Sequence, residues 1–229
     1  MSVPSDRVAP TPPRPLLSRR AEERLGARHR EVLDQLEALF LAEGFAGVSV
    51  RELAAHVGCS RRTLYELAPS KGELVLLVLD RFLQRVGRRA LDAIDPSAPY
   101  AVQLHDYITG AVELSRLTEV FAEDLADEPP ARRLFDRHFE YSRAVAEGIV
   151  RAGIAAGEFR PVVPGIVAGV LSSGALSFSR TGVLRATGLG FEAAVEVLVD
   201  LVIRSLVADD RTAASTTPVS RPAGARPSR

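Results

Sequence analysis

One short stretch of the chain carries most of the side chains that could bind a polyanion. Arg61, Arg62 and Thr63 stand at the start of a predicted helix. Tyr65 follows within that helix, and Lys71, the only lysine of the chain, comes soon after it. The guanidinium group of arginine can donate two hydrogen bonds, to O6 and N7 of guanine. Threonine can contact thymine, and tyrosine and lysine can reach phosphates. This pattern favours nucleic-acid binding over a solvated polar face.

Three serines mark the starts of the helices that would present these side chains. Ser49 and Ser70 each precede a glutamate by three residues, as in a capping box, and Ser60 directly precedes Arg61. These signals predict helices over residues 50–57 and 61–67 and a long helix from residue 71. A glycine turn at residues 58–60 joins the first two. Such an arrangement is a helix-turn-helix, whose second helix enters the DNA major groove.

The side chains of the two short helices separate into an apolar and a polar face. Leu53, Val57 and Leu64 are expected to pack on the preceding helix, whose apolar residues recur at intervals of three and four. The polar face is left outside. The predicted DNA-binding residues are Ser49, Arg51, Ser60, Arg61, Arg62, Thr63, Tyr65 and Lys71.

Composition limits the classes of protein to which the chain can belong. It has 229 residues, is 46% hydrophobic and carries no formal net charge. Residues 1–89 hold 15 basic and 11 acidic side chains, against 14 and 18 in residues 90–229, so the first part is the more basic. A single cysteine, Cys59, excludes an internal disulfide framework. The composition therefore suits a DNA-facing first part and an intracellular protein.

Motifs for enzymes, metals and membranes are missing from the sequence. There is no GxSxG, P-loop or GxGxxG pattern, and the four histidines form no cluster with cysteine. No apolar stretch approaches the roughly 20 residues of a membrane span. We therefore predict no catalytic residue, no metal site, no cofactor and no membrane partner, and we expect the protein in the cytoplasm.

Apolar periodicity predicts an all-α fold of about nine helices, with no strand alternation. Residues 1–22 are rich in proline and arginine and are predicted to be a disordered arm, and residues 208–229 a disordered tail. Residues 23–75 form the predicted three-helix DNA-binding domain and residues 76–207 a helical effector-binding and dimerisation domain. The helices expected after residue 70 cover residues 71–94, 99–117, 118–127, 130–156, 163–186 and 191–207.

The first part of the chain also resembles a known family. The segments that carry the resemblance are residues 29–40 (HREVLDQLEALF), 43–45 (EGF), 49–54 (SVRELA), 57–60 (VGCS), 63–65 (TLY) and 69–71 (PSK), with Leu74. Together they resemble the DNA-binding signature of the TetR (tetracycline repressor) family of transcriptional regulators. Ala68 stands where that family usually has an aromatic residue, and Arg62 where it often has glycine, so the operator could differ from those of relatives.

The last predicted helix is apolar on more than one side and must be covered by another surface. Its polar residues fall at every fourth position, and the preceding helix is rich in glycine and serine, which lets another helix approach closely. The resemblance implies that the two final helices pair across a dimer. The predicted dimer residues are Gly169, Ser173, Val195, Leu198 and Val202. Packing within one subunit is the alternative.

Aromatic and aliphatic side chains of the second part could surround a small hydrophobic effector. The candidates are Leu104, Tyr107, Ile108, Phe121, Leu125, Phe139 and Phe178. Such residues at helical spacing are also typical of an ordinary core. The resemblance implies a repressor that binds palindromic double-stranded operator DNA as a homodimer and is released by a small molecule. A helical regulator or adaptor without such a ligand is the alternative, and an enzyme is disfavoured.

Overall fold

The computed structural model describes residues 10–178 and 181–207 and is helical almost throughout. The first part contains α1 (Arg19–Arg24), α2 (Ala27–Glu43), α3 (Val50–His56), α4 (Arg61–Leu67) and α5 (Lys71–Asp92). The second contains α6 (Tyr100–Thr109), the 3-10 helix η1 (Val112–Arg116), α7 (Glu119–Asp127), α8 (Pro129–Ala155), α9 (Pro164–Phe178), α10 (Thr181–Thr187) and α11 (Phe191–Leu206). The all-α prediction is confirmed.

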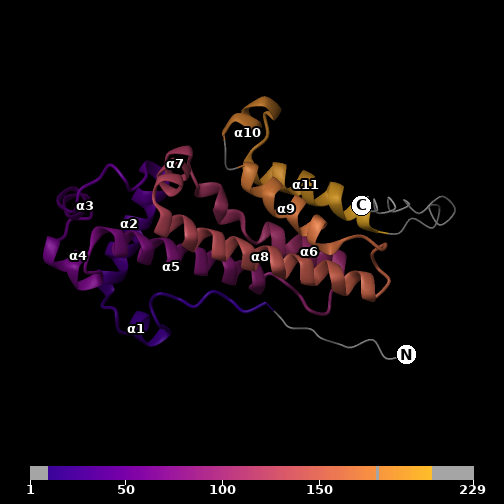
Figure 1. The fold of residues 1–229 in the computed structure, drawn as a ribbon, viewed down its shortest axis with the longest axis horizontal. Coiled ribbons are helices and arrows are strands. Elements are labelled where there is room, and N and C mark those ends of the chain that lie inside the picture. The colour runs from indigo at the N-terminus through magenta and orange to yellow at the C-terminus, as the bar shows by residue number, and fades with distance from the viewer. Residues whose placement is uncertain (1–9, 179–180, 208–229) are drawn as a thin grey trace, which may run out of the picture.

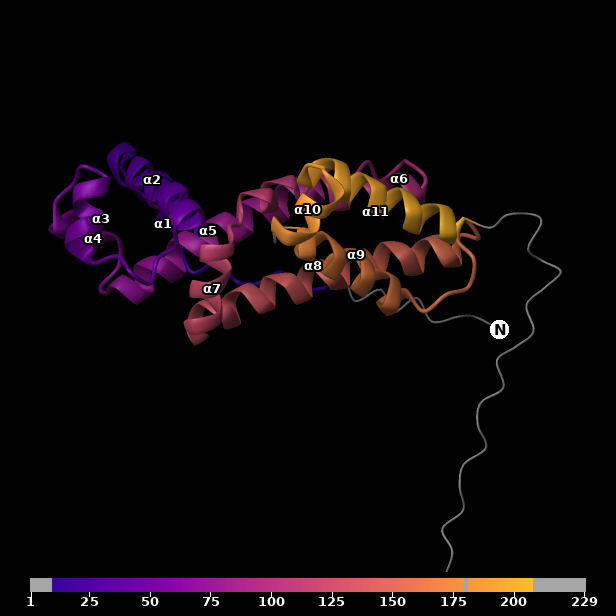
Figure 2. The ribbon, with the colours of Figure 1, turned by 90° about the horizontal axis from the view of Figure 1, so that it is seen from above.

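The molecule is elongated, with α2, α3 and α4 at one end and α6, α9 and α11 towards the other (Figures 1 and 2). α5 leaves the first group and runs beside α8. α9 packs on α8, and α11 packs on both α9 and α6. Within residues 10–178 and 181–207, no helix is long and apolar enough to cross a membrane.

Two clusters of buried side chains hold these helices together. The first lies among α2, α3, α4, α5, α7 and the start of α8, and the second among α6, the rear of α8, α9 and α11. α5 reaches both, because Leu74 and Phe82 belong to the first cluster and Ala90 to the second. This long helix is therefore the mechanical link between the two ends.

The turn between α8 and α9 is built on a glycine and a buried phenylalanine. Gly157 adopts a positive φ of 79°, which favours glycine. Phe159 is buried and its ring lies against Gly153, where a Cβ atom would come within 2.4 Å of it. Arg160 donates its backbone N–H to the Leu206 carbonyl at 2.9 Å, so this turn is tied to the end of α11.

The described chain has eleven α-helices rather than about nine, because α1 was not predicted and one predicted helix is divided into two. The helix expected over 99–117 ends at Thr109, because Gly110 approaches the α5 backbone at Ala90 closely and the chain then turns into η1. The helix expected over 163–186 is divided into α9 and α10. Ser177 donates its hydroxyl to the Gly174 carbonyl at 2.7 Å, and such bonds compete with the helical ladder.

The prediction that residues 1–22 are a disordered arm is wrong for residues 10–22. The Leu16 N–H donates to Asp80 of α5 at 2.8 Å, and Gln84 donates its side-chain amide to the Pro13 carbonyl at 2.9 Å. Ser18 then caps α1. The segment thus lies along α5, held by polar groups that composition does not reveal. Residues 1–9 and the tail predicted over 208–229 lie outside the described residues.

Candidate nucleic-acid interface

Serine caps begin α3, α4 and α5. The Ser49 hydroxyl accepts from the Glu52 N–H at 3.3 Å, and the Glu52 carboxylate accepts from the Ser49 N–H at 2.8 Å, which completes the predicted capping box. Hydrogen bonding by Ser49 lowers the pKa of Glu52. The Ser60 hydroxyl caps α4 at 3.1 Å. The box predicted at Ser70 has only one of its two bonds, from the Glu73 N–H at 3.2 Å.

The inner face of α3 and α4 packs on α2 as predicted. Leu53 and Leu64 are almost completely buried, in the cluster that also contains Val32 and Leu36 of α2. Ala68 is buried too, and Leu67 is half-buried against the same cluster. Because α3 and α4 are held by apolar contacts on one side only, their opposite face remains open to a partner.

The turn between α3 and α4 is fastened by a residue that the sequence reasoning missed. Gly58 has a positive φ of 58°. Arg28 donates from Nη2 to the carbonyls of Val57 and Gly58 at 2.9 and 2.7 Å, which satisfies the end of α3. Burial raises the pKa of the Cys59 thiol within the turn. Arg28 lies 30 positions from Gly58, so no local spacing could indicate its role.

The outer face of α4 presents arginines and a tyrosine. The Arg62 side chain is 89% exposed, Tyr65 is 53% exposed, and Arg61 is exposed as well. Arg62 pairs through Nε with Glu66 at 3.1 Å, which partly neutralises it. Arg51 is exposed on α3. Thr63 is half-buried, and its hydroxyl lies 3.0 Å from that of Ser60.

Lys71 has a partner inside the protein. It is half-buried, and its Nζ donates to the Ala46 carbonyl at 2.8 Å, which joins the turn after α2 to the start of α5. An ammonium group has three N–H donors. A phosphate could therefore be bound by Lys71 without breaking the bond to Ala46.

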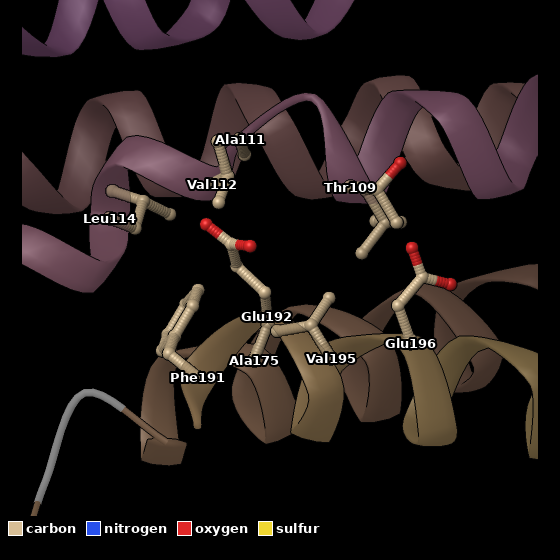
Figure 3. A pocket seen from close by; sticks show the side chains of 10 residues that line it. Thr109, Ala111, Val112, Leu114, Ala175, Phe191, Glu192, Val195 and Glu196 are labelled. Carbon is tan, nitrogen blue, oxygen red and sulfur yellow. The ribbon is translucent and has the colours of Figure 1, made fainter. Parts of the chain in front are cut away.

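Two adjoining cavities lie in the second part of the molecule. One, of about 90 Å³, is bordered by the predicted ligand residues Tyr107, Ile108 and Phe139. The other, of about 270 Å³, lies between α6, η1 and α11. Figure 3 shows it, with Glu192 and Val195 of α11 facing Ala111 and Val112. Four residues border both cavities: Ile108, Ala111, Leu114 and Ala175.

Four predicted ligand residues border neither of these two cavities. Phe121 stacks edge-on against Phe45, with ring centroids 5.8 Å apart, and Leu125 packs on the same cluster. Both residues belong to α7, which packs on α2 at the DNA-binding end (Figure 1). Leu104 and Phe178 pack in the second cluster. Spacing along a helix could not show which neighbour α7 would cover.

The predicted dimer residues are also only partly placed as expected. Val195 is buried in its own subunit, whereas Leu198, which lies against Gly174, and Val202, which packs on the second cluster, are half-buried. Gly169 is half-buried and Ser173 exposed. The exposed apolar side chains of α9 and α11 are Ile166, Val170, Val197 and Leu201. We call these four residues the outer apolar face.

A network of ion pairs connects α2 to η1, and sequence reasoning did not find it. Glu37 of α2 is 4% exposed and accepts from Arg85 of α5 at 2.7 and 2.8 Å. Arg116 of η1 also pairs with Glu37 at 3.0 Å, and Glu113 of η1 pairs with Arg85 and Arg89. These bonds raise the pKa of Arg85. The bonded residues are up to 79 positions apart, too far for any sequence pattern.

Comparisons with known proteins show which proteins this chain is similar to. The family described as "Bacterial regulatory proteins, tetR family" matches residues 32–78. The chain is similar to the uncharacterised HTH-type transcriptional regulator YdeS of Bacillus subtilis, with 26% identity over 62% of this chain and 73% of that one. It is similar to the HTH-type transcriptional repressor KstR2 of Mycobacterium tuberculosis, with 28% identity over 62% and 74%.

Solved structures share the fold. A bacterial regulatory protein of the tetR family from Rhodococcus aligns with a TM-score of 0.66 and 19% identity, over 81% of this chain and all of that one. A transcriptional regulator from Saccharomonospora viridis, solved in complex with choline, aligns with a TM-score of 0.65 and 19% identity, over 79% and 98%. Residues 32–78 with their capped helix-turn-helix therefore match the DNA-binding part of the tetR family of bacterial regulatory proteins, and the chain shares the fold of these solved structures.

Proposed function

We propose that the protein is a homodimeric transcriptional repressor that binds a palindromic operator through α3 and α4 and is released by a small hydrophobic molecule. The observation that carries this proposal is the outer face of α4. Arg61 and Arg62 stand exposed at the N-terminal end of a helix fixed by the Ser60 cap and by buried Leu64. Recognition helices enter the major groove by that end.

The remaining DNA contacts follow from position. Arg51 and Tyr65 flank the outer face of α4, and Lys71 begins the next helix, so they are placed to contact phosphates on either side of the groove. Ser49 and Ser60 use their hydroxyls as caps, so we assign them the role of orienting α3 and α4. A protein of this function must reach chromosomal DNA, and we expect it in the cytoplasm.

The outer apolar face supports the proposed homodimer. Ile166 is 67% exposed and Leu201 is 62% exposed, on helices that pack against each other. Apolar side chains gathered in this way are typical of an interface. Pairing through them would hold two α4 helices at a fixed separation, and an operator requires roughly 34 to 36 Å or a multiple of it.

η1 supports the proposed release by a ligand. Ala111, Val112 and Leu114, at and within η1, border the larger cavity, whereas Glu113 and Arg116 of the same segment bind the α2–α5 ion network. A molecule that displaces η1 would therefore act on Glu37 of α2. For such a ligand to release DNA, it must bind the non-binding arrangement more tightly than the DNA-binding one.

Selection of bound duplexes from a random DNA pool tests the proposal. We expect an enriched palindrome whose affinity falls steeply with salt, because the phosphate contacts release counterions. The dimer should be the bound species by light scattering. A pool that remains random after repeated selection would contradict the proposed function.

A further inference from the structure

A buried carboxylate joins α8 to the N-terminal segment. Asp80 of α5 is 1% exposed, and His138 of α8 is 9% exposed. His138 Nε2 lies 3.1 Å from one oxygen of Asp80, and the other oxygen accepts from the Leu16 N–H at 2.8 Å. An ionised carboxylate can only accept hydrogen bonds. A hydrogen bond between His138 and an ionised Asp80 therefore requires a proton on Nε2.

The second ring nitrogen of His138 is left without a partner. In residues 10–178 and 181–207, no group is hydrogen-bonded to Nδ1, although the ring borders the cavity of about 90 Å³. In a neutral imidazole protonated on Nε2, Nδ1 carries the lone pair and accepts hydrogen bonds. In this protonation state, His138 at the border of the cavity offers an accessible nitrogen that can accept a hydrogen bond from a ligand.

Four residues with hydroxyl groups also border this cavity: Tyr107, Tyr141, Ser142 and Ser172. The Tyr107 hydroxyl donates to the Ser142 carbonyl at 3.2 Å and lies 3.0 Å from the Ser142 hydroxyl. Burial, as the largest cause, raises the pKa of Tyr107 to about 12, so it stays neutral. Leu83, Val86 and Phe139 are among the apolar residues that border the cavity. A ligand would meet mainly apolar walls, with Nδ1 of His138 and the side chains of Tyr141 and Ser172 as further polar neighbours.

We propose that this cavity binds an apolar molecule with a hydroxyl group, and that the hydroxyl donates its hydrogen bond to Nδ1 of His138. This inference rests on the proposed function, because it names the ligand class of the proposed effector site. A carboxylate ligand would find no donor at Nδ1 and would face the buried charge of Asp80 across the imidazole ring, so anions are disfavoured. An apolar molecule without a hydroxyl would leave Nδ1 unsatisfied, which lowers its affinity.

The size of the cavity also limits which ligands can bind. A cavity of about 90 Å³ is smaller than the roughly 150 Å³ that holds benzene in an engineered protein core. An aromatic ring bound at His138 must therefore extend past Ile108 or Ala111 into the adjoining cavity of about 270 Å³. This path brings the ligand against η1.

Asp80 acts as a positioning residue in this arrangement. Its charge fixes the proton on Nε2 of His138, and its second oxygen holds Leu16. Asparagine at position 80 would offer a single carbonyl oxygen to these two donors. Asp80→Asn should therefore weaken the preference for a hydroxyl and also speed hydrogen exchange at the Leu16 amide.

The test compares phenol, toluene and benzoate as probes of the full-length protein. Phenol and toluene differ by a hydroxyl in place of a methyl group. We expect phenol to bind about tenfold more tightly than toluene in an NMR titration, as one added hydrogen bond allows, and benzoate to bind more weakly than phenol. His138→Gln should abolish the difference between phenol and toluene, and His56→Gln, at an exposed position on α3, should keep it.

The nitrogen chemical shifts of His138 test the same inference without a variant. We expect the shifts of a neutral ring protonated on Nε2. A proton on Nδ1, equal binding of phenol and toluene, or tighter binding of benzoate would each overturn the inference. If the wild-type protein shows one of these results and still selects a palindrome, the ligand class alone is wrong. If no DNA is selected, the proposed function fails.

Discussion

The DNA-binding end and the cavity end of the molecule are both built from α-helices, but the helices are held in place in different ways. At the first end, Ser49, Ser60 and Ser70 each begin a helix through a bond to a residue three positions away. At the second end, α9 and α11 have no serine cap, and long-range packing decides which sides are covered. Hydrogen bonds between residues three positions apart can be predicted from the sequence. Which of two apolar sides of a helix is buried depends instead on neighbouring helices that are distant in the chain.

The largest effect is expected from substitutions that compare the exposed side of α11 with its buried side. We expect Val197→Glu combined with Leu201→Glu to produce a folded monomer with greatly weakened operator binding, because both residues belong to the outer apolar face. Val195→Glu should instead unfold the second part, because its carboxylate would be buried in the second cluster. Light scattering and circular dichroism distinguish these results. A folded Val195→Glu monomer beside a dimeric double variant would reverse the assignment of the two sides.

Much of the first end could be predicted from the sequence, and the reason is physical. The capping box at Ser49 and the turn at Gly58 follow from contacts within a few residues, and the burial of Leu64 follows from the spacing of apolar residues along its helix. The contacts of Leu198 with Gly174 and of Phe121 with Phe45 could not be predicted, because each residue lies on a predicted helix whose partner is distant in the chain. The arm at residues 10–18 was missed because backbone bonds to Asp80 and Gln84 leave no compositional trace.

Removing a buried charge between the two ends should have the next largest effect. Glu37→Ala leaves Arg85 and Arg116 without their shared carboxylate. We expect a loss of roughly 2 to 3 kcal/mol in the free energy of unfolding, at the low end for buried pairs because both arginines are partly exposed. Urea denaturation measures it, with Glu31→Ala on the exposed side of α2 as the control. A loss of unfolding free energy no larger than that of the control would show that the network does not stabilise the fold.

Removing the helix caps at the DNA-binding end should have a smaller effect on the free energy of unfolding. Ser49→Ala should cost about 1 kcal/mol of unfolding free energy, as is usual for a lost N-cap. Glu52→Ala should cost more than Glu73→Ala, because Glu52 accepts from the Ser49 N–H whereas the capping box at Ser70 lacks this second bond. Equal losses for the two glutamate variants in urea denaturation would mean that the reciprocal bond of Glu52 contributes nothing.

The smallest effect concerns the contact between α6 and α11. His105 is hydrogen-bonded to Asp106 at 3.0 Å and to Glu196 at 2.9 Å, and these partners raise its pKa above 6.5. The charged form is favoured in the folded state, so the stabilisation is complete below pH 6.5 and is lost as pH rises through the raised pKa. The free energy of unfolding of wild type minus that of His105→Gln should therefore be larger at about pH 6 than at about pH 9. A difference independent of pH would show that His105 acts through packing alone.

The central claim is that the outer face of α4 reads DNA, and binding to the selected palindrome tests it directly. Affinities for the palindrome and for random duplex DNA should be measured at two salt concentrations for wild type, Arg61→Ala, Arg62→Ala and Arg137→Ala. Arg137 is the control, because it is an exposed arginine on α8. We expect each α4 variant to lose about 1 to 3 kcal/mol of preference for the palindrome and the control to lose none. Unchanged preference in both α4 variants would contradict the account.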